Sequence, residues 1–446
     1  MLKWFIILMA GVLVLNNSDS AHAEEPEFFP YAWQEKVLDN GLKILAVPME
    51  NSTLVSYYSV VRTGSRDEWE PGHSGFAHFF EHMMFRGTKN FPGSVYDSIV
   101  TTLGADANAY TTDDYTAYHL TFAPEDLERV IEIESDRFQY LDYAEAEFKT
   151  ESGAVYGEFR KGRVNPWSVL NETIMNTAFD KHTYKHTTIG FEADIAAMPG
   201  MYEYSRNFFK RYYRPENVVI IIAGAIDSEK IFALAEKYYG NWEQGYVNPA
   251  IPKEPLQKKE RYVEVDFKGK TLPVIDIGYK GEAFAPQDRL YAAMHILGEL
   301  AFGPNSDLYK KLVIREQRLQ LFGYDYTYNR DPRLFEIYAM IKSEDDIQSV
   351  RMEIDETINQ FKTQPVNEQK LNELKDRLRY DFLMRLDTPD RVAGSLARFA
   401  ALSGGIEVID QLFGTFQQVT ASDVMEAARE YFVNERRTTA LLRGGK

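Results

Sequence analysis

The residues best suited to chemistry stand together in one short segment, His78-Phe79-Phe80-Glu81-His82. On a helix, His78 and His82 lie one turn apart on the same face, so both imidazoles can point at one metal ion. Glu81 is one turn from His78, and its carboxylate can reach a metal-bound water without ligating the metal. An isolated histidine is more often a surface or core residue, but histidine is scarce here, with 8 in 446 residues. The H-x-x-E-H order therefore predicts a metal-dependent hydrolytic site.

A catalytic zinc also needs a third protein ligand and an open position for water. The chain contains no cysteine, so this ligand must come from His, Asp or Glu. We assign it to Glu158, on a helix expected over residues 144–162. Glu151 lies two turns earlier on the same face and is expected to orient a histidine ligand or the water. A second interpretation stays open, because Glu145 and Glu147 on this helix are also typical of a solvated acidic face.

An α+β pattern of strands and helices surrounds these residues. Ser74 is expected to cap a helix over residues 75–86 that carries both histidines. The turn sequence Asp39-Asn40-Gly41 predicts a hairpin within residues 33–48. The other expected elements are strands over 54–61, 107–111, 115–122 and 218–223, and helices over 124–141 and 228–239.

The composition narrows the class of protein. Hydrophobic residues make up 44% of the chain and aromatic residues 14%, enough to bury large cores. The formal net charge of −17 makes the chain a poor binder of a phosphate backbone, so we expect no nucleic-acid partner.

Residues 1–23 have the pattern of a signal peptide. Lys3 precedes an apolar run over residues 4–15, and Ala21-His22-Ala23 matches a cleavage site. The alternative is an uncleaved signal anchor, although the run is shorter than the ~20 residues of a membrane span. No later stretch is long and apolar enough, so we expect no membrane span after cleavage. Export without cysteine favours the periplasm over secretion.

The chain also shows signs of internal duplication. A Pro-rich linker is expected over residues 247–258, between a metal-binding domain at 24–246 and a second domain at 259–446. Gly64 and Gly281 are 217 residues apart, and so are His78 and His295. The position equivalent to His82 is Glu299, so we expect no metal site in the second domain. We predict two tandem α+β domains of one fold, each a mostly antiparallel sheet packed with helices; the alternative is two unrelated α+β domains.

Several motifs carry a family resemblance along the whole mature chain. The chain resembles the pitrilysin/insulinase family of zinc metallopeptidases (the inverzincins), in the short form similar to the mitochondrial processing peptidase β-subunit and bacterial periplasmic relatives. The matching segments are Leu38-Asp39-Asn40-Gly41-Leu42, Gly64-Ser65-Arg66-Asp67-Glu68, the run from Gly75 to Thr88, Asn108-Ala109-Tyr110-Thr111, Glu151, Glu158 and Tyr213-Arg214-Pro215-Glu216-Asn217.

The resemblance implies roles for these residues. It implies that His78, His82 and Glu158 bind one Zn²⁺ per chain and that Glu81 is the general base. It implies two domains facing each other across a chamber. It also implies that Asn108, Ala109 and Tyr110 lie on an edge strand that pairs with an extended peptide; propensity alone would allow a plain hairpin strand.

One departure from the family pattern concerns the second domain. Active members carry there an Arg and, seven residues later, a Tyr that bind substrate and help to stabilise the oxyanion. Here Arg315 is followed at that spacing by Phe322, and Tyr324 stands two residues further on. Arg315 and Tyr324 are therefore the substrate-binding candidates within the chain.

These observations lead to one expected function and two alternatives. We expect a zinc endopeptidase that hydrolyses peptides or unfolded protein segments, with Glu81 activating a zinc-bound water. The first alternative is a zinc-carrying subunit that is weakly active alone and works as a homodimer or with a zinc-free paralogue that supplies the Arg/Tyr pair. The second is a non-catalytic binding or scaffold homologue.

Overall fold

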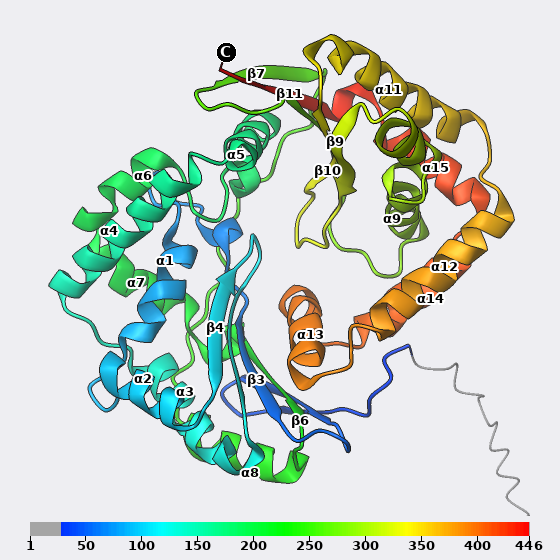
Figure 1. Ribbon diagram of the computed structural model, residues 1–446. Coiled ribbons are helices and arrows are strands. Elements are labelled where there is room, and N and C mark those ends of the chain that lie inside the picture. Colours follow the sequence, from blue (N-terminus) through cyan, green and yellow to red (C-terminus); the bar gives the residue numbers. More distant parts are fainter. Residues whose placement is uncertain (1–27, 446) are drawn as a thin grey trace, which may run out of the picture.

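The computed structural model describes residues 28–445, and the expected signal peptide with its cleavage site lies outside them. Within this range the strands form two sheets. We call residues 28–246 the first half and residues 259–445 the second half. Figure 1 shows one sheet in each half, with helices packed around both.

The sheet of the first half has the strand order β1-β2-β6-β3-β5-β4. Its pairs are antiparallel except β2 with β6. The strands are β1 (Gln34–Val37), β2 (Lys43–Pro48), β3 (Val55–Val61), β4 (Asp106–Thr111), β5 (Thr116–Phe122) and β6 (Val218–Gly224). The predicted hairpin is confirmed, because β1 and β2 are joined by a turn in which Gly41 has a φ of 86°.

The sheet of the second half has the order β7-β11-β8-β10-β9. Its strands are β7 (Arg261–Phe267), β8 (Val274–Lys280), β9 (Leu319–Asp325), β10 (Leu334–Ile341) and β11 (Arg437–Gly444). This order repeats that of β2-β6-β3-β5-β4, including the single parallel pair, here β11 with β7. The prediction of two similar α+β units is therefore confirmed at the level of topology.

The helices of the first half are α1 (Phe76–Met83), α2 (Gly93–Thr102), α3 (Leu127–Tyr140), α4 (Glu145–Gly162), α5 (Pro166–Ala178), α6 (Glu192–Ala197), α7 (Tyr202–Tyr212) and α8 (Ser228–Tyr239). Those of the second half are α9 (Arg289–Phe302), α10 (Asp307–Tyr309), α11 (Ile347–Thr363), α12 (Glu368–Leu383), α13 (Pro389–Ser403), α14 (Val408–Gln418) and α15 (Ala421–Tyr431). A short π-helix, Lys310–Arg315, follows α10. The repeat extends to these helices, since His78 on α1 corresponds to His295 on α9.

The two halves exchange one helix each. Helix α5 of the first half packs on β7 and β11 of the second sheet, whereas α13 of the second half packs on β3 and β6 of the first (Figure 1). Every residue of β3 is buried because α13 covers one face and the helices of the first half cover the other. The exchange joins buried residues of β2, β3 and β6 to the core of the second half. Neither sheet is therefore covered by its own half alone.

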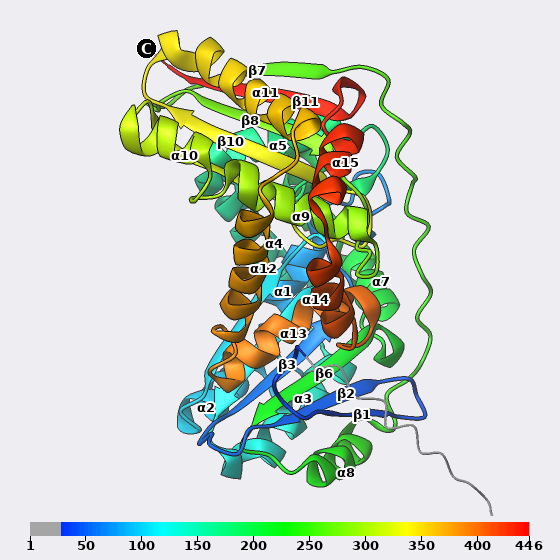
Figure 2. The same ribbon diagram turned by 90° about the vertical axis from the view of Figure 1, so that its right-hand side faces the viewer.

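The connection between the halves runs extended along one side of the molecule (Figure 2). Residues 247–258 contain no helix or strand, in agreement with the composition of a linker. The chain is nevertheless held in place there, because Glu254 accepts hydrogen bonds from the backbone N–H groups of residues 180–182 and from Lys280 Nζ. In residues 28–445 no single helix is long and apolar enough to cross a membrane; the bent pair α13 and α14 passes that test only together.

Candidate metal centre

Helix α1 carries the histidine cluster on the side that faces away from its core residues. Its buried residues are Phe76, Ala77, Phe79, Phe80 and Met83, which pack in the core of the first half. Because the helix repeats every 3.6 residues, the side chains between them, at positions 78, 81 and 82, stand together on the opposite side. All three are only partly buried. The local sequence alone thus aligns the two imidazoles with the carboxylate of Glu81.

The start of α1 differs from the prediction that Ser74 caps it. The first residue before the helix is Gly75, which has a φ of 93°. A Cβ at this position would lie 2.6 Å from the Ile189 carbonyl oxygen, so a side chain is excluded. The buried carboxylate of Glu68 accepts the N–H groups of Gly75 and Ala77, at 2.7 and 2.6 Å. Ser74 instead donates its hydroxyl to Asp194. The prediction was wrong because a glutamate outside the helix satisfies the free N–H groups.

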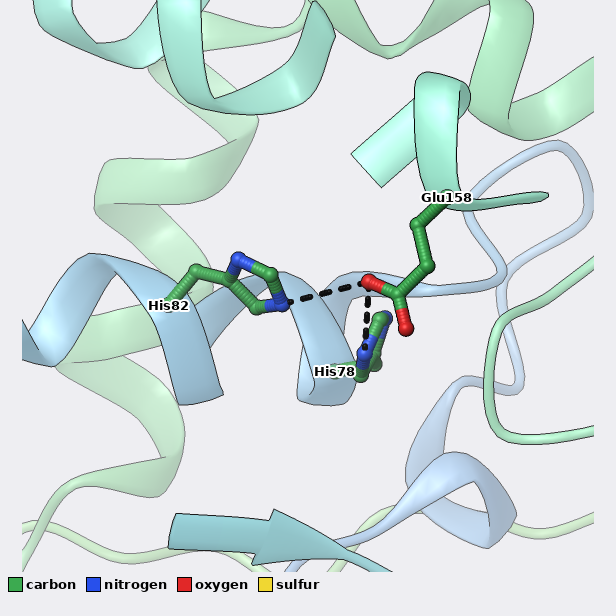
Figure 3. A group of neighbouring side chains, drawn as sticks. All are labelled: His78, His82 and Glu158. Atoms are coloured by element: carbon green, nitrogen blue, oxygen red, sulfur yellow. Dashed lines mark ion pairs between the residues drawn. The ribbon is translucent and has the colours of Figure 1, made fainter. Parts of the chain in front are cut away.

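The side chain of Glu158 reaches the two histidines from α4 (Figure 3). Its Oε2 lies 3.7 Å from His78 Nε2 and 3.6 Å from His82 Nε2, and the three ligand atoms lie within 4.8 Å of one another. Zinc bonds of about 2.0–2.2 Å to nitrogen and oxygen place neighbouring ligands about 3.3–3.6 Å apart in a tetrahedron. The two distances to Glu158 Oε2 are too long for good hydrogen bonds and lie close to the spacing of ligands around one zinc ion. Burial lowers the pKa of His78, which favours the neutral imidazole that a metal requires.

Glu151 contacts the outer side of His82. Its Oε1 lies 3.0 Å from His82 Nδ1, while its other oxygen pairs with Arg86, the last residue of the 3-10 turn that follows α1. The hydrogen bond to Glu151 raises the pKa of His82, and the same bond, aided by Arg86, lowers the pKa of Glu151. A carboxylate on Nδ1 fixes the ring orientation and directs Nε2 towards Glu158. The contact is the one that the orienting role requires, and that role stays a prediction.

Glu81 lies beside this group without joining it. Its Oε2 accepts a hydrogen bond of 2.7 Å from Thr111 Oγ1, on the last residue of β4. Strand β4 is at the edge of the first sheet, with β5 as its neighbour. Asn108, Ala109 and Tyr110 lie on this strand, and the Asn108 side chain is exposed, with its Oδ1 accepting the N–H of Ala109. An edge strand has unpaired backbone groups, as the pairing of a peptide requires.

The structure does not bring Arg315 and Tyr324 to this group. Arg315 is exposed at the end of the π-helix, and Tyr324 is on β9 of the second sheet. The Tyr324 hydroxyl donates to Glu299 Oε1 at 3.0 Å, and Phe322, on the same strand, is buried in the core. Among the described residues, no hydrogen bond or ion pair connects either candidate with the histidine cluster.

The counterpart of the cluster in the second half contains an ion pair. Glu299, at the position equivalent to His82, pairs with Arg377 of α12 at 2.5 Å. The ring of His295 lies among aromatic rings, including those of Tyr291 and Tyr326. Desolvation lowers its pKa to about 3, so the ring is neutral. At this position the ion pair of Glu299 with Arg377 links α9 to α12.

Sequence reasoning did not assign roles to Thr111, Arg86 and Glu68. Thr111 belongs to the motif Asn108-Ala109-Tyr110-Thr111, but nothing in the sequence shows that its hydroxyl meets Glu81. Arg86 and Glu68 lie close to the cluster in sequence, yet their partners are set by helix packing and by a loop.

Comparisons with known proteins identify the family. The profile described as "Insulinase (Peptidase family M16)" matches residues 45–191, and the one described as "Peptidase M16 inactive domain" matches residues 202–378. "Zinc protease PqqE" of Helicobacter pylori is 30% identical over 443 residues, which span 98% of this chain and 97% of that protein. The chain belongs to the M16 (insulinase/pitrilysin) family of peptidases.

Further relatives agree with this membership. "Uncharacterized zinc protease YmxG" of Bacillus subtilis is 23% identical over 89% of this chain and 95% of that protein. The crystal structure of a protease from Helicobacter pylori has a TM-score of 0.87 and 27% identity, covering 93% of this chain and 99% of that one. The periplasmic protease PqqL from Escherichia coli shares the fold, with a TM-score of 0.76 and 21% identity, and this chain covers 48% of its length.

Proposed function

We propose that this M16 protein is a zinc-dependent endopeptidase acting on peptides or unfolded protein segments. The observation that carries the proposal is the convergence of two imidazoles and one carboxylate beside Glu81, next to an open sheet edge. The relatives named zinc proteases support the same chemistry. The profile described as inactive matches residues 202–378, and the histidine cluster lies in the part matched by the other profile.

Each residue has a distinct part in the proposed reaction. His78, His82 and Glu158 would hold the zinc, which supplies Lewis acidity to the scissile carbonyl and acidifies the attacking water. Glu81 takes the proton of that water and delivers it to the amine nitrogen as the C–N bond breaks. Strand β4 holds the peptide by main-chain pairing, and the exposed Asn108 amide is available to its backbone.

Removal of the metal tests this function directly. Purified mature protein should contain about one zinc per chain and cleave fluorescein-labelled denatured casein. Treatment with a chelator should abolish cleavage, and addition of Zn²⁺ should restore it, because the residues alone supply no Lewis acid. The control is the same chelator treatment followed by addition of Mg²⁺, a poor match for two imidazole ligands. Cleavage that persists in zinc-free protein would contradict the proposal.

We also propose that the protein acts in the periplasm. The pattern of residues 1–23 is typical of an export signal, and the related protease PqqL is described as periplasmic.

A second candidate is that the chain is the zinc-carrying subunit of a larger peptidase. The hydroxyl of Tyr324 is held by Glu299, and Phe322 occupies the position expected for the oxyanion-stabilising tyrosine. This chain also matches only about half of the PqqL chain, as one of two similar parts would. A second copy or a zinc-free paralogue would then provide the missing Arg/Tyr pair.

Tyr324→Phe tests this candidate. We expect kcat to stay within about threefold of wild type, because the hydroxyl is already paired with Glu299 and, within residues 28–445, makes no hydrogen bond to the histidine cluster. Tyr380→Phe, at an exposed tyrosine of α12, is the matched control. Peptidase activity should be measured for the chain alone and for its mixture with the zinc-free paralogue. The mixture should cleave the peptide faster than the chain alone. A loss of ~100-fold or more in Tyr324→Phe would place the oxyanion donor in this chain.

A further inference from the structure

Thr111 connects the substrate-pairing edge of the sheet to the proposed general base. Its hydroxyl donates to Glu81 Oε2 at 2.7 Å. Within residues 28–445 no other hydrogen bond reaches the Glu81 carboxylate. Glu81 is partly exposed, so the hydroxyl of Thr111 is what restricts the rotation of its carboxylate. The hydrogen bond occupies one oxygen and leaves the other available to a water.

The position of Thr111 is itself fixed by the turn that follows it. Thr111 pairs with Thr116 across the β4–β5 hairpin. The hydroxyl of Thr112 accepts the N–H groups of Asp114 and Tyr115, at 3.2 and 3.1 Å, which closes the turn. The turn therefore has little freedom to carry Thr111 away from Glu81.

The second half holds the same turn from outside. The buried carboxylate of Asp114 accepts hydrogen bonds from Asn329 Nδ2 at 2.9 Å and from the Arg330 N–H at 3.1 Å. Arg333 Nε donates to Asp113 at 2.7 Å. Charged and buried hydrogen bonds of this kind are stronger than exposed ones. The loop between β9 and β10 thus anchors the end of β4, although it lies far from α1 in the sequence.

We propose that Thr111 is a positioning residue that holds the Glu81 carboxylate in the orientation needed for proton transfer. The inference rests on the proposed peptidase function. Because Thr111 belongs to the strand that pairs with the substrate, one element places both the scissile bond and the base. The anchoring of the turn by the second half explains how a half without the histidine cluster contributes to the site.

The test compares Thr111→Val, which replaces the hydroxyl by a methyl group of similar size, with Thr111→Ser, which keeps the donor. The assay uses the zinc-loaded protein as it purifies and a quenched fluorescent peptide that the wild type cleaves. On this peptide, Thr111→Val should lower kcat about tenfold. KM and zinc content should stay within about twofold. Thr111→Ser should recover most of kcat. Thr121→Val, on β5 and without contact to Glu81, is the matched control and should behave as wild type.

A double mutant separates positioning of the base from a general effect on the strand. If Thr111 acts through Glu81, adding Thr111→Val to Glu81→Gln should cause no further loss of kcat. Wild-type kcat in Thr111→Val, or an equal loss in Thr111→Ser, would overturn the role of Thr111 while leaving the peptidase function intact. A raised KM or lost zinc in Thr111→Val would also overturn it, by showing a distorted strand. A wild-type protein that binds zinc but cleaves no peptide would instead overturn the proposed function.

Discussion

Glu81→Gln should keep the fold and the bound zinc but lower kcat by at least ~100-fold. The substitution preserves the size of the side chain, and the amide oxygen can still accept the hydrogen bond from Thr111. An amide cannot take a proton from water at neutral pH, so only the transfer step is removed. The three proposed ligands are untouched, which is why zinc content should stay at about one per chain.

The measurement is kcat on a defined peptide together with zinc content by atomic emission. Glu125→Gln, at an exposed glutamate before α3, is the matched control and should be indistinguishable from wild type. Near wild-type turnover in Glu81→Gln would remove Glu81 as the base. Under the alternative of a non-catalytic scaffold, neither substitution would change function, so this comparison also tests that alternative.

His82→Ala should lose both the zinc and the activity. The change removes one of the three proposed ligands and leaves Glu151 paired only with Arg86. Two remaining ligands, one of them on a half-exposed glutamate, cannot complete a site that needs three. The melting temperature should become insensitive to added Zn²⁺, because stabilisation by a ligand requires binding to the folded state.

The control for this variant is His73→Ala. His73 lies just before α1, where its ring stacks on Tyr204, and it is not one of the three proposed ligands. It should keep its zinc. Full metal retention in His82→Ala would contradict the proposed ligand set, whatever the activity.

The sequence by itself determined the features that depend on neighbouring residues. The spacing of His78, Glu81 and His82 puts them on one side of a helix wherever that helix is placed. The Asn40-Gly41 turn and the continuous apolar run of β6 were predicted from local preference and are present in the structure. The offset of 217 residues between equivalent residues predicted two domains of one fold, and the two sheets do have the same strand order.

Tertiary structure alone decided which distant groups meet. Packing of α4 against α1 brings Glu158 within 3.7 Å of both imidazoles, whereas its sequence pattern equally allowed a solvated acidic face. The capping of α1 by Glu68, the contact of Thr111 with Glu81 and the exchange of α5 and α13 had no signal in local periodicity. The physical reason is that periodicity records which side of an element is buried, but not which element covers it.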